Sequence, residues 1–471
     1  MNWILRLVVV ASAVTAPMEA LTAHAADSLQ AAVPPAPAAS NSEGLGHQLI
    51  GVAGCNAVSC HGGRSLVGGE AGAWQQRDTM HRRAYEILFN DVSVAMAKKL
   101  DLKNDAGVSI GAHQHARCLA CHSSSRDQKP NHGDRFALEY GVGCESCHGA
   151  AGDWIAKHTT RTWKSLSTTQ KSELGFRNLG SLTTRAETCV ACHIGSPAAT
   201  VDHDLIAAGH PRLAFEMSSF HSMLPRHWDA TLETQQDPGQ EIRLWAIGQA
   251  ASAKAMSDIA AARAKKAVHE KASHILPDFA EFDCNACHHD LTEPTLGRPT
   301  LRQPLGTPRW GSWSVPSAKF LAQGTASEKS LESLLAVMGQ SRLRSAPANE
   351  VDAAAQRASD DLASWLRSLE SSRYDAAQAM QLLHRVIDAK SDAEWQPNWD
   401  GQMQRYLAIA AASQSLQRLT GKTPFPPSSD SRALIPLRTR LKYRPNYATP
   451  PAYDPTEVDH LLAELRKNMA H

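Results

Sequence analysis

The arrangement of its ten cysteines constrains this chain more than any other feature, because they form five pairs and a histidine directly follows each pair. Four pairs have the spacing C-x-x-C-H: Cys118-Leu-Ala-Cys121-His122, Cys144-Glu-Ser-Cys147-His148, Cys189-Val-Ala-Cys192-His193 and Cys284-Asn-Ala-Cys287-His288. The fifth, Cys55-Asn-Ala-Val-Ser-Cys60-His61, has two more residues between its cysteines. C-x-x-C-H is the attachment motif of c-type haem, in which two thiols hold one porphyrin covalently and the adjoining imidazole binds its iron. The sequence therefore predicts about five covalently attached haem c groups.

The expected proximal iron ligands are the histidines that end the motifs: His61, His122, His148, His193 and His288. Pairs of C-x-x-C units can also bind zinc, but a zinc site does not require a histidine directly after the second cysteine. For Cys55 and Cys60, an ordinary disulfide is the alternative to haem attachment.

A low-spin haem needs a second axial ligand, and we expect histidines to supply it. His81 lies in an expected helix after the first motif, and His158 lies ten residues beyond His148. His203 and His210 are seven residues apart, so on a helix they would share a face and could serve two haems. These four are the expected distal ligands. His115 and His221 are the next choices, in competition with His113, His132, His227, His269 and His274.

The composition and the N-terminus indicate an exported protein. The 48 Lys and Arg residues balance 47 Asp and Glu residues, which gives no support for nucleic-acid binding. Residues 1–25 have one basic residue, a short apolar run and the end Ala23-His24-Ala25, as expected of a signal peptide removed during export to the periplasm. An uncleaved anchor is the alternative, but the apolar run is short for a spanning helix. No later segment is expected to span a membrane.

The rest of the chain divides into three expected parts: a Pro- and Ala-rich linker at 26–45, a multihaem domain at 46–303 and a helical C-terminal domain at 304–471. Short helices and long loops are expected around the haems. Apolar spacing predicts one long helix over about Gly239–Ala272. In the C-terminal part it predicts helices at about Glu328–Met338, Glu350–Leu369, Tyr374–Asp388, Trp399–Leu419 and Thr456–Met469.

Three segments carry a resemblance to a known family: Tyr140-Gly-Val-Gly-Cys-Glu-Ser-Cys-His-Gly149, Val201-Asp-His-Asp-Leu-Ile-Ala-Ala-Gly-His-Pro-Arg-Leu213 and Phe279-Ala-Glu-Phe-Asp-Cys-Asn-Ala-Cys-His-His-Asp-Leu291. They resemble multihaem c-type cytochromes of the cytochrome c-554 type, which are similar in haem packing to hydroxylamine oxidoreductase and pentahaem nitrite reductase. The resemblance covers about residues 50–300. It implies a mainly α fold, closely stacked haems and distal ligation by His81, His158, His203 and His210.

The chain departs from this family in two ways. It has five motifs where the type member has four haems, and it has no C-x-x-C-K motif of the kind that holds the catalytic haem of pentahaem nitrite reductases. Nor is the crosslinking tyrosine context of a hydroxylamine oxidoreductase evident.

Two functions remain in consideration. The first is electron transfer between other redox proteins or quinone-linked cytochromes. The second is a redox enzyme with one five-coordinate iron that acts on hydroxylamine, nitrite, nitric oxide or tetrathionate. We favour the carrier, because iron with two histidine ligands keeps the same ligands in both oxidation states.

Overall fold

The computed structural model describes residues 47–63, 69–125, 131–270, 278–284, 288, 309–340, 347–390, 395, 398–425, 433–441 and 455–469. It is mainly helical, with 64% helix, which confirms the expected fold class. Among the described residues β structure is limited to isolated bridges, such as Leu49 with His132 and Phe282 with Trp310. The expected signal peptide and linker, together with Cys287 and His274, lie outside the described residues.

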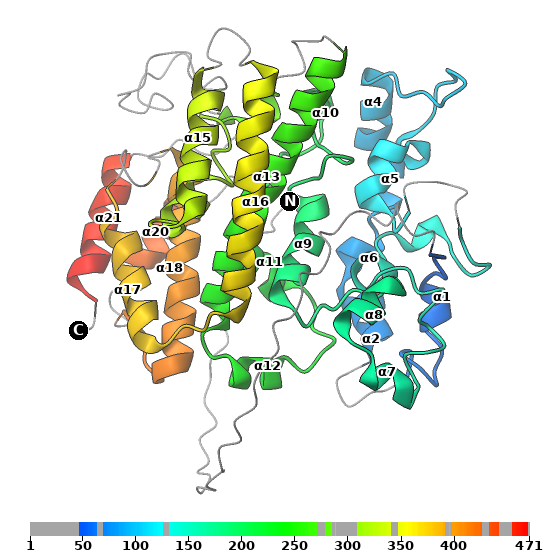
Figure 1. Cartoon of the computed structure of the whole chain (residues 1–471), viewed down its shortest axis with the longest axis horizontal. Helices are drawn as coiled ribbons and strands as arrows, with labels where there is room; N and C mark the ends of the chain where they lie inside the picture. Colours follow the sequence, from blue (N-terminus) through cyan, green and yellow to red (C-terminus); the bar gives the residue numbers. More distant parts are fainter. Residues whose placement is uncertain are drawn as a thin grey trace, which may run out of the picture.

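One side of the molecule consists of long helices (Figure 1). They are α9 (Leu182–His193), α13 (Gln240–Glu270), α15 (Ala326–Gln340), α16 (Ala348–Ser371), α17 (Ala376–Asp388), α18 (Trp399–Thr420) and α21 (Pro455–Lys467), with the shorter α11 (Met217–Met223), α14 (Pro316–Leu321) and α20 (Ile435–Leu441). Helices α13, α15, α16, α17 and α18 match the spans expected from apolar spacing to within two residues at each end. Helix α21 begins and ends within two residues of its expected span.

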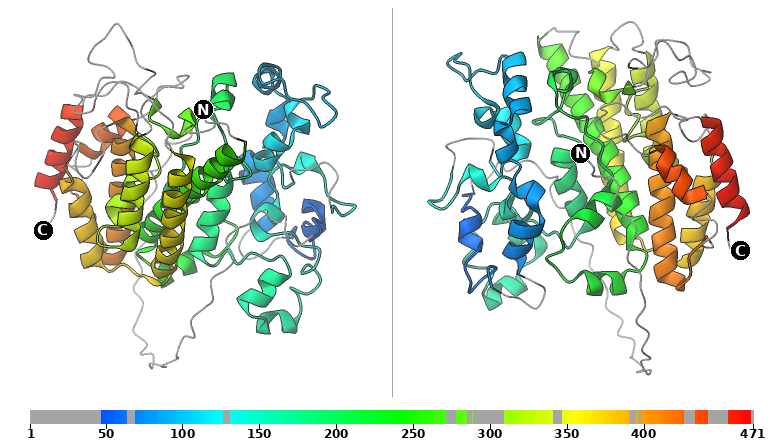
Figure 2. Two further views of the ribbon diagram at one scale, coloured as in Figure 1. Left: turned by 45° about the horizontal axis from the view of Figure 1, so that its top comes forward. Right: turned by 180° about the vertical axis from the view of Figure 1, so that it is seen from behind.

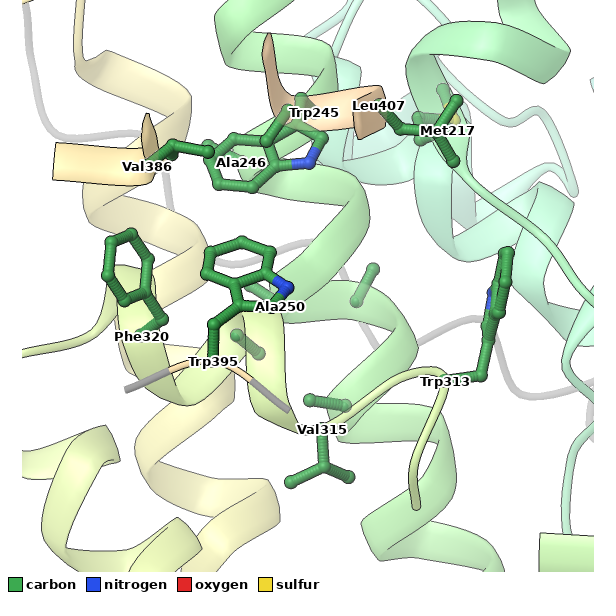
Figure 3. Close-up of a cluster of buried hydrophobic side chains, with 14 of the residues drawn as sticks. Met217, Trp245, Ala246, Ala250, Trp313, Val315, Phe320, Val386, Trp395 and Leu407 are labelled. Atoms are coloured by element: carbon green, nitrogen blue, oxygen red, sulfur yellow. The ribbon is translucent and has the colours of Figure 1, made fainter. Parts of the chain in front are cut away.

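Helix α13 is the centre of this side. It packs against α9, α11, α14, α16 and α18, and Ile242, Leu244, Trp245 and Ile247 are completely buried. Its many alanines favour the helix and allow neighbouring helices to approach closely. Figure 3 shows Trp245 of α13 together with Val386, Leu407 and Trp313, which come from elements far apart in the sequence.

The other side is built from short helices joined by loops, as the rear view also shows (Figure 2). These are α1 (Val52–Cys55), α2 (Glu70–Gly72), α3 (Thr79–Arg82), α4 (Asp91–Lys99), α5 (Ala116–His122), α6 (Cys144–His148), α7 (Arg161–Ser165), α8 (Thr168–Glu173) and α10 (His203–Ala208). Helix α12 (Ala230–Gln236) lies below α11 in Figure 1, and its Glu233 pairs with Arg185 of α9 at 2.9 Å. The one hydrophobic cluster found among its described residues is small: Tyr85, Leu88, Ala97, Leu102, Ala112 and Leu119.

The division expected at residue 303 falls outside the described residues. A single hydrophobic cluster extends across it, from Leu182 of α9 to Met469. Helices α9, α11 and α13 therefore pack with the C-terminal helices, although they belong to the expected multihaem domain. No helix of the described residues is long and apolar enough to cross a membrane.

Candidate haem sites

Three of the cysteine motifs occupy the ends of helices. Helices α5, α6 and α9 each end at the histidine of a motif, namely His122, His148 and His193. Residues three apart on a helix face the same side, so both thiols of a C-x-x-C unit project in one direction. The motif at 55–61 reaches a related arrangement by a turn, in which the amide of His61 donates to the carbonyl of Cys55 at 3.4 Å.

Within the described part of the chain the nine cysteines form no disulfide, and Cys55 and Cys60 are not bridged to each other. Burial raises the pKa of Cys147 to about 11 and that of Cys189 to about 12, so both thiols are protonated at neutral pH. Within the described ranges, no three His, Cys, Asp or Glu side chains are arranged to hold a metal ion.

Each of the five motif histidines faces one other imidazole at nearly the same distance. The ring centres are 6.2 Å apart for His61 and His158, 6.1 Å for His193 and His81, 6.3 Å for His122 and His210, 6.2 Å for His148 and His227, and 6.4 Å for His288 and His203. The partners come from distant segments in every case.

This spacing suits an iron held between two imidazoles. A metal–imidazole bond is about 2 Å long and the ring centre lies about 1 Å behind its nitrogen, so two opposed ligands have ring centres about 6 Å apart. Stacked rings in van der Waals contact would lie closer, as His132 and Phe136 do at 3.8 Å. The five pairs therefore fit bis-histidine haem ligation.

Hydrogen bonds at Nδ1 support the same interpretation. Nδ1 of His122, His210 and His227 donates to the carbonyl oxygens of Ala84, Pro211 and Pro225, at 2.8, 2.8 and 3.3 Å. Nδ1 of His158 likewise donates to a backbone carbonyl, that of Ile155. A proton held at Nδ1 leaves the lone pair of Nε2 available to a metal.

The charge state of the buried imidazoles also suits ligation. Burial lowers the pKa of His148 and of His193 to about 4, so both rings are neutral at pH 7, as a metal ligand must be. His81 differs: burial opposes its charged form, but the Asp78 carboxylate, 2.8 Å from Nδ1, outweighs burial and raises its pKa. A carboxylate on Nδ1 orients a ligating imidazole and makes it more basic.

The structure brings all four expected distal histidines opposite a motif histidine, but not always the nearest one in sequence. His158 follows His148 closely, yet it lies opposite His61, and His81 lies opposite His193. His203 begins α10 and His210 follows its end, and the two face different motifs, as their spacing allowed.

The imidazole opposite His148 is that of His227, which the sequence placed below His221 and His115 among the candidate ligands. His221 is buried and its Nε2 lies 2.7 Å from the guanidinium of Arg185, while His115 caps α5. No local spacing distinguishes His227, because it approaches His148 through tertiary packing. The other competitors lie elsewhere: His113 stacks on Phe89, His132 stacks on Phe136, and His269 lines a surface pocket with Lys265 and Asp352.

Two hydrogen bonds between thiols and one charge interaction indicate which motifs are neighbours. A hydrogen bond with Cys144 lowers the pKa of Cys55, and a hydrogen bond with Cys121 raises the pKa of Cys192. Cys147 also contributes to the raised pKa of Cys189, after burial. The motif at 144–148 therefore lies between those at 55–61 and 189–193, and the last of these adjoins 118–122.

A carboxylate inside one motif holds two of them together. Glu145 is buried and accepts hydrogen bonds from the amides of Ile50, Gly51 and Ala151, at 2.9, 2.8 and 2.8 Å. Two of these amides lie just before α1, so Glu145 fastens the segment that leads into Cys55 against α6.

The segment before Cys284 is tied to the C-terminal helices. Asn398, which caps α18, donates to Asp283 at 2.9 Å. Arg212 forms a two-pronged ion pair with the buried Asp400 of α18, at 2.8 and 2.9 Å. These contacts join the start of α18 to the segment that leads into Cys284 and to the segment that follows His210.

Residues 52–149 match the model of the protein family described as Cytochrome c554 and c-prime. The match includes three of the five motifs and lies within the region where a resemblance is expected. No curated protein and no solved structure matches the chain.

Proposed function

We propose that this chain, whose residues 52–149 belong to the cytochrome c554 and c-prime family, is an exported cytochrome that carries electrons through five covalently bound haem c groups. The family is one of multihaem c-type cytochromes, so haem-based electron transfer follows from the match. The haem count, the ligand pairs, the partners and the export are the parts that we propose.

The five imidazole pairs are the observation that carries the proposal. His61, His122, His148, His193 and His288 would be the proximal ligands, opposed by His158, His210, His227, His81 and His203 in that order. Haem supplies reversible one-electron exchange at its iron. The residues of this chain hold each imidazole pair at one separation, which limits rearrangement when the oxidation state changes.

The sites form a row that does not follow the order of the motifs in the sequence. Two hydrogen bonds between thiols and the charge interaction of Cys147 with Cys189 support the order 55–61, 144–148, 189–193, 118–122. The motif at 284–288 extends the row, because its partner His203 and the partner of His122, His210, lie at the two ends of α10. Arg117, next to Cys118, pairs with Asp202, the cap of α10, at 2.5 Å.

The enzyme alternative requires one iron with an open axial position. Every motif histidine has an imidazole opposite it, so the geometry supports the carrier. The test is the mass and the spin state of the exported protein from a host that matures c-type cytochromes. We expect the mass of the processed chain plus five haems, and low-spin iron alone at low temperature. A high-spin iron that binds nitric oxide or nitrite would replace this proposal with the enzyme.

A further inference from the structure

The segment at 157–164 carries positive charge at one end of the row of sites. It contains His158, the imidazole opposite His61, and the first residues of α7. Both α1 and α7 lie at the edge of the molecule, on the side away from α17 and α21 (Figures 1 and 2). A partner that binds here would approach the first site of the row.

Three cations of this segment are exposed, namely Lys157, Arg161 and Lys164. None of the three forms an ion pair with a carboxylate in the described part of the chain, whereas the nearby Asp153 is paired with His47. The whole chain has a formal net charge of only +1. The positive charge is therefore a local property of this segment and not a consequence of a basic protein.

Aromatic packing fixes this segment against the first site. Trp154 is buried and contacts His158, with ring centres 5.4 Å apart. Trp163 of α7 and Trp154 both pack against Phe176, at 5.2 and 5.3 Å. The hydroxyl of Thr160 accepts from the amide of Trp163 and caps α7. The three cations thus project from a rigid support that is joined to a proposed haem ligand.

We propose that Lys157, Arg161 and Lys164 form a docking surface for an acidic electron-transfer protein, which exchanges electrons with the haem held by His61 and His158. Positive charge beside an exposed redox site attracts a partner whose own cofactor edge is surrounded by carboxylates, and it accelerates association. This inference rests on the proposed function, since it assumes that the first site holds a haem.

Flavodoxin, a small acidic flavoprotein, is a suitable probe. The haem-loaded protein is compared with K157Q/R161Q/K164Q and with a matched control, K329Q/R367Q/K422Q, which removes three exposed cations from the long-helix side. Two quantities are measured at low and high ionic strength: the affinity for oxidised flavodoxin by calorimetry, and the rate of electron transfer from its hydroquinone by stopped flow. Each protein is also reduced with dithionite, which needs no docking surface, to check that its haem accepts electrons normally.

At low ionic strength we expect the affinity of the first variant for flavodoxin, and its rate of electron transfer from flavodoxin, to be about tenfold lower than those of the parent protein. At high ionic strength the difference should disappear, because salt screens the charges. The control variant should behave like the parent. Equal losses in both variants, or no loss in the first, would overturn the docking surface. So would a loss of binding to anionic phospholipid vesicles with unchanged flavodoxin kinetics. Failure of all three proteins to take electrons from dithionite would instead refute the proposed function.

Discussion

Replacement of His227 by alanine removes the imidazole that lies 6.2 Å from His148, with the ring planes at 72°. Among the described residues, no other imidazole is placed opposite His148. The nearest rival in sequence, His221, is buried and its Nε2 lies against Arg185 at 2.7 Å. The variant therefore leaves one proposed iron without its sixth ligand while four keep theirs.

The expected magnitude is a conversion of about one fifth of the haem from low-spin to high-spin iron, because one of five equivalent chromophores loses an axial ligand. Low-temperature electron paramagnetic resonance and the optical spectrum measure this fraction directly. Added imidazole should restore the low-spin state, which separates ligand loss from general misfolding. H221A is the matched control, since it removes a nearby buried histidine without removing a proposed ligand.

Two results would refute this reasoning. The first is an H227A protein that stays entirely low-spin, which would show that another residue ligates the iron of His148. The second is high-spin iron in the H221A protein and none in the H227A protein. That result would show that His221, and not His227, is the ligand opposite His148.

Three further predictions concern other features of the structure. Three of the imidazole pairs are crossed, at 70°, 88° and 72°, and two are nearly parallel, at 16° and 28°. Crossed ligand planes leave two iron orbitals nearly equal in energy, so paramagnetic resonance should show three strongly anisotropic low-spin signals and two ordinary ones; five alike would contradict the geometry. D400N should lower the free energy of unfolding in denaturant by about 3–5 kcal/mol, because Arg212 loses its partner in a largely buried pair. D388N, which breaks the half-exposed pair with Arg466, should cost at most about 1 kcal/mol, and equal losses would count against the buried pair. Burial, and then the charge of Arg185, lower the pKa of His221 to about 4, below its ordinary 6.5. The unfolded chain therefore binds more protons between these values, and stability falls with acidification across that window by up to about 3 kcal/mol. H221Q should flatten the pH dependence of unfolding between pH 6.5 and 4, and an unchanged slope would show that another group titrates.

The cysteine motifs and the helices could be identified from the sequence because both depend on residues close together in the chain. A C-x-x-C-H motif places two thiols and an imidazole on one turn of helix, as in α5, α6 and α9. Apolar residues at helical spacing indicate α16 and α18 to within two residues of their observed ends. Local geometry determines such features whatever the rest of the chain does.

The pairing of imidazoles, in contrast, was decided by tertiary structure. His158 is only ten residues from His148 in the sequence, but it lies opposite His61, because Glu145 and Cys144 bring the segment before Cys55 against α6. His227 could not be preferred to His221 from spacing alone. What separates them is that Arg185, on α9, occupies Nε2 of one and leaves the other free to face His148.

The sequence by itself determined the chemistry that this chain supports: paired thiols with an adjacent imidazole, five times, on a helical scaffold. Only the tertiary structure decided which imidazoles face one another, which cysteine motifs are neighbours, and how the segment before Cys284 is attached to α18 through Asn398. The physical reason is the range of the interactions. Thioether attachment and helix formation act within a few residues, whereas opposition of two rings about 6 Å apart requires packing between segments distant in the chain.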